Sequence, residues 1–172
     1  MNQITVTERL YLRELTFDDA AFIVSLVNTP GWLQYVGDRN IATKEDAIGY
    51  LTNGPMSGYN KYGFGLWAVC LKKKDIPIGI CGVFKRDTTA ICEIGFALLP
   101  EFEGVGYAHE AVKATIEVAK SQFDLKDLTA VATKDNARSI ALLQRIGFRK
   151  SEENVPAENG VELLQFEMKL SG

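Results

Sequence analysis

The amino-acid sequence predicts a single domain over residues 1–172, of the α/β class and α+β type, with a mixed, mostly antiparallel sheet flanked by helices. Three observations support this fold class. A chain of 172 residues has room for one core, which would bury roughly 70% of the unfolded surface. Strand-like segments with short connections follow one another in the middle of the chain, which favours an antiparallel meander. A buried strand then passes through a glycine-containing turn into a helical pattern.

The N-terminal third is expected to contribute one strand and two helices. Residues 9–15 alternate polar and apolar side chains and predict a half-buried strand. Thr16 and Thr43 each precede acidic residues and a helical pattern, as helix N-caps do. Residues 32–39 and 53–63 lack a clear period and are rich in aromatic, polar and glycine residues. Residues 32–39 either belong to the core or form a loop that lines a substrate pocket, and residues 53–63 predict a loop that either lines a pocket or lies at the surface.

The rest of the chain alternates between strands and helices without an internal repeat. Three strand-like segments, at 64–71, 76–84 and 90–99, form the expected meander. The elements predicted after them are a helix from about Ala108 with one apolar face, a strand at 128–133, a helix at 137–146, and strands at 149–151 and 161–170 around a loop at 152–160. This order predicts one mixed sheet with helices on its faces.

Composition argues against several functional classes. The net charge of −3 and pI of about 5.3 argue against a surface for nucleic acids or acidic membranes, both of which need clustered Lys and Arg. The chain has no apolar run near the ~20 residues of a membrane span and no signal-peptide core, so we expect a cytoplasmic protein. Three cysteines without metal-site spacing are expected to be reduced core residues, with no metal bound: Cys70, Cys81 and Cys92.

The most informative stretch is the junction at 91–111, where the strand, the turn and the helix meet. The start of a helix collects unpaired N–H groups and a positive potential, and glycines let a ligand approach the backbone. Such a junction is a site for an anion, most often a phosphate. A dinucleotide-binding loop would need glycine at His109, and a P-loop would need Gly-Lys-Ser/Thr; neither pattern is present. The alternative is a turn that merely ends the strand.

A second motif lies further along the chain. Asn136 begins a helical pattern, and Gly147 followed by Phe148 ends it. Taken alone, these residues predict an N-cap and a left-handed C-terminal stop, without a binding function.

Together the two motifs resemble the signatures of the GNAT N-acetyltransferases. Residues 103–108, Glu-Gly-Val-Gly-Tyr-Ala, fit the pattern Gln/Arg-x-x-Gly-x-Gly/Ala at every place but the first, and residues 136–148 have the spacing of the second signature. The opening Arg-Leu-x-Leu-Arg, together with Glu93 to Phe96, is similar to the RimJ/RimL-like branch, which acetylates amines including protein N-termini. The resemblance covers roughly the whole chain, although residues 28–63 are too generic to carry acceptor specificity over.

The resemblance implies acetyl-CoA as co-substrate and an amine as acceptor. It implies that the strand edge at Phe96, Ala97 and Leu98 pairs its backbone with the pantetheine arm, and that Asn136 hydrogen-bonds the same arm. The loop that would hold the pyrophosphate, mainly through its backbone amides, comprises Glu103, Gly104, Val105, Gly106, Tyr107 and Ala108. Glu103 departs from the usual Gln or Arg and brings a carboxylate near the phosphates unless its side chain turns outward.

The implied reaction is direct attack of a neutral amine on the thioester in a ternary complex, which requires an oxyanion donor, a base and an acid. The family places the N–H of Leu98 at the oxyanion. Leu143 stands where many members carry the tyrosine that protonates the thiolate, so Ser139 is the candidate acid, or it orients a water. Glu93 is the candidate base, directly or through water. Cys92 and Glu93 point to opposite faces of the sheet, however, and if Glu93 faces away its role is structural.

Two other functions stay open at this stage. One is a GNAT-fold module that binds acyl-CoA as a sensor without turnover, suggested by Glu103 and the missing tyrosine. The other is a nucleotide-binding protein with a chance glycine loop. The acceptor is likewise open between a peptide N-terminus, a polyamine, an antibiotic and a small amino compound, and the chain could act as a monomer or a homodimer.

Overall fold

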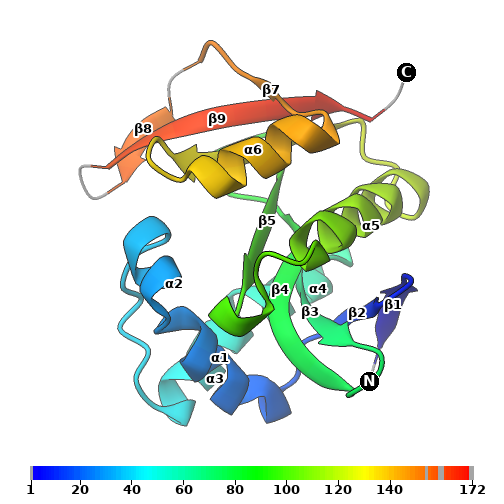
Figure 1. The fold of residues 1–172 in the computed structure, drawn as a ribbon, viewed down its shortest axis with the longest axis vertical. Helices are drawn as coiled ribbons and strands as arrows, with labels where there is room; N and C mark the ends of the chain where they lie inside the picture. The colour runs from blue at the N-terminus through cyan, green and yellow to red at the C-terminus, as the bar shows by residue number, and fades with distance from the viewer. Residues whose placement is uncertain (1, 154, 159–160, 171–172) are drawn as a thin grey trace.

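A computed structural model describes residues 2–153, 155–158 and 161–170. Its strands are β1 (Gln3–Val6), β2 (Leu10–Glu14), β3 (Leu66–Leu71), β4 (Ile76–Phe84), β5 (Cys92–Leu98), β6 (Asp127–Thr133), β7 (Arg149–Lys150), β8 (Val155–Glu158) and β9 (Val161–Lys169). Within the described residues they form one sheet in the order β1-β2-β3-β4-β5-β6-β9-β7, with β8 paired to β9 (Figure 1). All neighbours are antiparallel except β5 and β6, which confirms the predicted mixed sheet.

Helices cover both faces of this sheet. They are α1 (Ala20–Val27), α2 (Pro30–Tyr35), α3 (Lys44–Asn53), α4 (Pro55–Tyr62), α5 (Tyr107–Ser121) and α6 (Ala137–Ile146), with short 3₁₀ turns at Phe17–Asp19 and Pro100–Phe102. In the part of the chain that the structure describes, none of them has the length and apolar character needed to cross a bilayer.

The alternation of side chains along the central strands builds two cores. On β3, Trp67 and Val69 pack with α5 and α6, whereas Ala68 and Cys70 pack on the opposite face with α1 and α3. All three cysteines are buried and unbridged, as predicted. Burial raises the pKa of the Cys81 thiol to about 12, and its Sγ lies 3.2 Å from Thr115 Oγ1 of α5. This contact ties α5 to the middle of the sheet.

Two segments for which no helix was predicted form helices. Residues 30–35 form α2, because Thr29 caps the helix through the N–H of Trp32 and Pro30 occupies its first position. Most of 53–63 forms α4, which begins at Pro55 and ends at Gly63, whose φ of 83° allows a left-handed cap. Residues 28–63, the region too generic to carry acceptor specificity over, are therefore more ordered than their glycine content suggested.

Two short strands were not predicted. β1 pairs with the edge of β2, with a register irregularity after Gln3. β8, which lies within the segment predicted as a loop at 152–160, pairs antiparallel with β9. Both are too short to give a clear period in the sequence. Residues 154, 159 and 160 of that segment lie outside the described residues.

The sheet opens into a fork in the middle. β5 and β6 pair only at Cys92 with Leu128 and at Glu93 with Thr129, and beyond these positions the two strands have no mutual register. β5 continues to pair with β4, and β6 with β9. The facing edges of β5 and β6 are thus left without a strand partner.

The second motif forms the cap structures that were predicted. At the end of α6, the N–H of Phe148 donates to Leu143 O at 2.9 Å and that of Gly147 to Gln144 O at 3.2 Å, which is a Schellman motif. The φ of Gly147 is 122°, a value that favours glycine.

Candidate active site

The loop at 103–108 has the backbone geometry of an anion site. Gly104 and Gly106 have φ of 81° and 91°, and Gly106 is the left-handed N-cap of α5. Among the described side chains none caps the start of α5, and the loop from Glu103 to Gly106 is exposed. The first amides of this 15-residue helix are therefore available to a negatively charged ligand.

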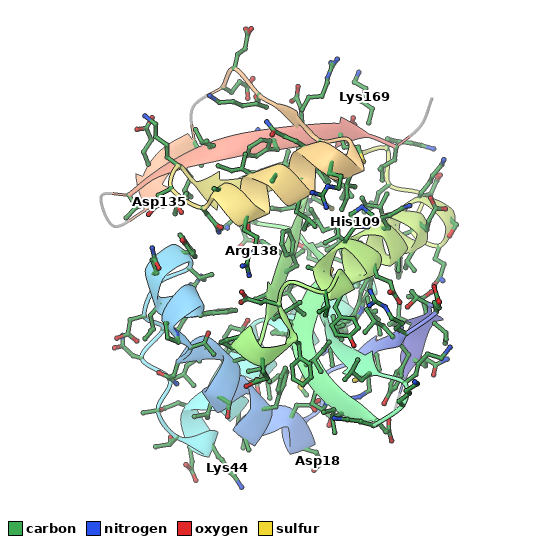
Figure 2. All side chains as sticks on the ribbon, viewed as in Figure 1. Asp18, Lys44, His109, Asp135, Arg138 and Lys169 are labelled. Carbon is green, nitrogen blue, oxygen red and sulfur yellow. The ribbon has the colours of Figure 1, made fainter. Side chains whose placement is uncertain are left out.

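The carboxylate of Glu103 is paired with a cation. It accepts a hydrogen bond from Nη1 of Arg138 in the first turn of α6, forming an ion pair. Figure 2 shows Arg138 extending from α6 toward the loop that precedes α5. The pair neutralises the one carboxylate that distinguishes this loop from the family pattern, and it links the two sides of the fork.

Arg9, at the N-terminal side of β2, supports the loop from behind. Its Nη1 donates to Val105 O at 2.9 Å, its Nε to Glu110 Oε1 at 2.8 Å, and its guanidinium lies 4.4 Å from the centre of the Tyr107 ring. Burial alone would raise the pKa of Glu110, but hydrogen bonds from Thr7 and Arg9 lower it below its ordinary value. Sequence reasoning missed this support, although the opening Arg-Leu-x-Leu-Arg could have signalled it.

The register of β5 decides which backbone groups face the fork. The N–H of Leu99 donates to Ile78 O on β4 at 2.8 Å. In an antiparallel strand, the backbone N–H and C=O of every second residue point to the same side. The N–H and C=O of Ala97 therefore also face β4, whereas those of Phe96 and Leu98 face the fork. The backbone groups of Ala97 are thus already committed to β4, and the strand offers those of Phe96 and Leu98 to a ligand in the fork.

A cavity of about 510 Å³ connects the fork with helices α2 to α4. Five of the predicted site residues line it: Glu93, Phe96, Ala97, Asn136 and Ser139. Neither Leu98 nor the loop 103–108 is among the described residues that line the cavity. The cavity thus unites the predicted base and acid, and the anion loop is a separate, exposed surface at the start of α5.

Glu93 faces the cavity and is nearly buried, with 7% of its surface exposed. Cys92 and Ile94 belong to the core under α5 and α6, so Glu93 lies on the face covered by α1 and α3. Its Oε1 accepts a hydrogen bond from Arg86 Nε at 2.9 Å, and its Oε2 lies 3.3 Å from Arg86 Nη2. The carboxylate is thereby held in one orientation.

Asn136 and Ser139 meet at the start of α6. Oδ1 of Asn136 accepts a hydrogen bond from the N–H of Ser139 at 3.3 Å, which caps the helix and leaves the serine hydroxyl at the cavity wall. Leu143, one turn later, is only 1% exposed and belongs to the core.

Substitutions of Asn136 separate its cap from a role in ligand binding. We expect Asn136→Ala to lower the free energy of unfolding by about 1 kcal/mol, as a lost cap does. Asn136→Asp keeps a capping oxygen but removes the amide donor, so we expect unchanged stability with a raised KM for acetyl-CoA. Denaturant unfolding and initial rates measure the two effects. An unchanged KM in Asn136→Asp would leave only the cap.

Helices α2 to α4 add aromatic and cationic side chains that the sequence did not identify as site residues. Trp32, Tyr35, Tyr50 and Tyr62 line the cavity together with Arg39, Lys61, Lys85 and Arg86. Burial raises the pKa of Tyr50, and the nearby charge of Arg39 opposes that rise. The aromatic residues next to polar ones at 32–39 were the available signal.

This geometry suits two ligands that meet at the fork. The loop offers amides to an anion, the open edge at Phe96 and Leu98 offers backbone donors and acceptors to an extended chain, and the cavity beyond holds a carboxylate and a hydroxyl. A chemical group that one ligand carries through the fork would face a second ligand bound in the cavity.

Comparison with known proteins agrees with this geometry. Residues 9–149 match the family model described as acetyltransferase (GNAT) domain. The chain is 26% identical over 144 residues to the uncharacterized N-acetyltransferase YnaD of Bacillus subtilis, covering 84% of this chain and 81% of that protein. A GNAT-family acetyltransferase structure from Bacillus anthracis superposes with a TM-score of 0.81 at 21% identity, covering 99% of both chains.

The structure of RimL, a ribosomal L7/L12 alpha-N-protein acetyltransferase, in complex with coenzyme A also superposes with a TM-score of 0.81. The identity is 16%, and 98% of each chain is covered. At such identities the likeness concerns the fold, and it is consistent with the RimJ/RimL-like branch.

Proposed function

Because this chain belongs to the acetyltransferase (GNAT) domain family and is an N-acetyltransferase, we propose that it transfers the acetyl group of acetyl-CoA to a primary amine by direct attack in a ternary complex. The acceptor would be a protein or peptide N-terminus or a small-molecule amine. The observation that carries the proposal is the cavity, which joins the fork between β5 and β6 to the helices of the acceptor side. The family predicted from the two motifs is confirmed.

In this proposal the chain binds acetyl-CoA, which supplies the acetyl group as a thioester, along the loop and the fork. The pyrophosphate-binding residues are Glu103, Gly104, Val105, Gly106, Tyr107 and Ala108. Phe96 and Leu98 offer their free backbone groups, Ala97 contributes to the cavity wall, and Asn136 offers its amide. The ion pair with Arg138 neutralises the carboxylate of Glu103, which weakens one of the two reasons for preferring a sensor without turnover.

The proposed catalytic roles follow from positions at the fork and in the cavity. The N–H of Leu98 faces the fork and would donate to the developing oxyanion, an interaction that can be worth ~3 kcal/mol. Glu93 would accept the proton of the acceptor ammonium, directly or through a water. Ser139 would return a proton to the sulfur or orient the water that does so.

We further propose that residues 1–172 act as one domain. The family match ends at residue 149, but β9 pairs with β6 and forms one side of the fork, and β1 pairs with β2 at the other end of the sheet. Both segments outside the match thus belong to the sheet that carries the site.

The proposed function is tested by incubating the protein with acetyl-CoA and a panel of amines and following thiol release. We expect amine-dependent release with one thiol per acetylated product found by mass spectrometry. Tight coenzyme A binding without release by any amine would favour the sensor. Protection against heat by ATP or NAD, with none by coenzyme A, would favour a nucleotide-binding protein.

Two substitutions test the proton path. Ser139→Ala should lower kcat with little change in KM, because the interaction exists chiefly in the transition state. We expect a loss at the low end of general-acid effects, ~10-fold, since a thiolate is a good leaving group. Glu93→Gln should lower kcat by about 10²-fold. Full activity in either variant would exclude that side chain from the proton path.

A further inference from the structure

We infer that the acceptor carries a carboxylate near the amine that is acetylated, which deepens the proposed function and rests on it. The shared chemistry is a primary amine beside an anionic group, as in an amino acid or in a peptide with an acidic residue next to its N-terminus. Polycationic amines are excluded by the same argument.

The charge of the cavity carries this inference. Arg39, Lys61, Lys85 and Arg86 line it, against the carboxylates of Asp87 and Glu93, so its described wall has an excess of two positive charges. The whole protein has a net charge of −3, and the cavity therefore has the opposite sign from its surroundings. Such a cavity concentrates anions and repels polycations.

The cations differ in how far they are already engaged. Arg86 pairs with Glu93, and Lys85 Nζ lies 5.7 Å from the centre of the Tyr62 ring. Across the described ranges of the chain, neither Arg39 nor Lys61 has an ion-pair partner. Both come from the segments on the acceptor side, Arg39 after α2 and Lys61 in the last turn of α4, and both are exposed at the cavity wall. They are the charges available to an incoming carboxylate.

Aromatic side chains complete the same wall. The indole Nε1 of Trp32 is buried and has no hydrogen-bond partner among the described residues, and Trp32 lines the cavity. This N–H is closed off from the cavity itself, so Trp32 contributes the surface of its ring to the wall. The surrounding tyrosines offer apolar surface for the rest of the molecule.

The same cations would assist the reaction. An ammonium group that enters a positively charged cavity loses its proton more readily, because like charges disfavour the charged form. The free amine is the nucleophile, so the cations would raise the fraction of the bound acceptor that is deprotonated and reactive. The carboxylate of the acceptor would offset the repulsion between these cations and the ammonium.

A matched set of amines tests the inference. It contains tyrosine and tyrosinamide, the peptides Ala-Glu-Ala-amide and Ala-Gln-Ala-amide, and spermidine. At least one carboxylate member should exceed its partner without the carboxylate by ~10-fold in kcat/KM, equivalent to ~1.4 kcal/mol, and spermidine should be the poorest acceptor. The pair that shows the preference identifies the source of the carboxylate. Equal rates within both pairs, or spermidine as the best acceptor, would overturn the inference.

Variants place the preference on the cavity. Arg39→Gln combined with Lys61→Gln should reduce the preference toward parity while the KM for acetyl-CoA stays unchanged. Lys73→Gln combined with Lys74→Gln removes the same charge from an exposed turn between β3 and β4 and should leave the preference intact. Equal effects of the two double variants would mean that only the overall charge matters, which would contradict the inference.

Binding separates this inference from the proposed function. Calorimetry with protein saturated with coenzyme A measures the affinity for each amine without turnover. If no amine releases thiol but the carboxylate members still bind ~10-fold more tightly than their partners, acetyl transfer is disproved, and the preference of the cavity for a carboxylate beside an amine is all that remains. If turnover occurs and neither rates nor affinities distinguish the partners, the inference fails and the proposed function stands.

Discussion

Gly106→Asp is expected to weaken coenzyme A binding by at least tenfold, or ~1.4 kcal/mol, in a protein that remains folded. Two effects combine at this position. A φ of 91° is strained for a residue with a side chain, and the new Cβ would lie 3.2 Å from Arg9 Nη2. The new carboxylate would also stand at the start of α5, where, in the proposed site, the amides of the helix would bind the pyrophosphate. Calorimetry measures the affinity, and circular dichroism checks the fold.

Gly106→Asn is the matched control. Asparagine has the size of aspartate and tolerates a positive φ better than most residues, so it retains much of the steric effect without the charge. We expect its affinity to lie between those of the wild type and Gly106→Asp. An affinity of Gly106→Asp equal to that of the wild type would remove the loop from the binding site.

Asp19→Ala is expected to produce the largest loss of stability, about 3–5 kcal/mol. Asp19 and Arg13 form a buried pair in which Nη1 and Nη2 each donate to a carboxylate oxygen at 2.8 Å. Asp19 also accepts the N–H of Thr16 at 2.8 Å, completing the capping box before α1. The substitution would leave a guanidinium buried without its partner, at the point where the sheet passes into the acceptor-side helices. Urea unfolding measures the loss.

Two controls identify the cause. Asp18→Ala removes the neighbouring exposed carboxylate, labelled in Figure 2, and should change stability by no more than about 0.5 kcal/mol. Arg13→Met combined with Asp19→Leu replaces the pair with apolar side chains and should recover most of the stability lost in Asp19→Ala. If the combined variant is as unstable as Asp19→Ala, the loss comes from the missing cap and not from the buried charge.

The sequence predicted those parts of the fold whose signals are local. α6 was predicted with its bounds, because Asn136 and Gly147 mark both of its ends by their own chemistry. The junction before α5 was recognisable because a proline, two glycines and a helical pattern follow a strand in order. The pairing of Cys92 with Leu128 joins residues far apart in the chain and therefore has no local signal. The extent of the fork could be predicted only from the resemblance to the family.

The acceptor side was harder to predict because its structure depends on distant contacts. α4 contains Gly58 in its interior, which lowers helix propensity, but a side chain there would lie 2.8 Å from Phe64 O. Tyr59 of the same helix accepts the N–H of Leu15 at 3.0 Å and donates to Leu66 O. The cationic wall of the cavity, drawn from three segments separated by more than 20 positions, has no local signature either.

The fork has a consequence for the solubility of the free enzyme. An unpaired strand edge can template the addition of another strand, and proteins usually protect the outer edges of their sheets against such aggregation. Here Phe96 and Leu98 place an unpaired edge in the interior of the sheet, opposite that of β6. Occupation of this edge by a ligand would complete the hydrogen bonding of the sheet and, at a hundredfold excess over Kd, stabilise the native state by ~2.7 kcal/mol. Cellular acetyl-CoA would then act as a folding ligand as well as a substrate, and its depletion would expose the chain to aggregation.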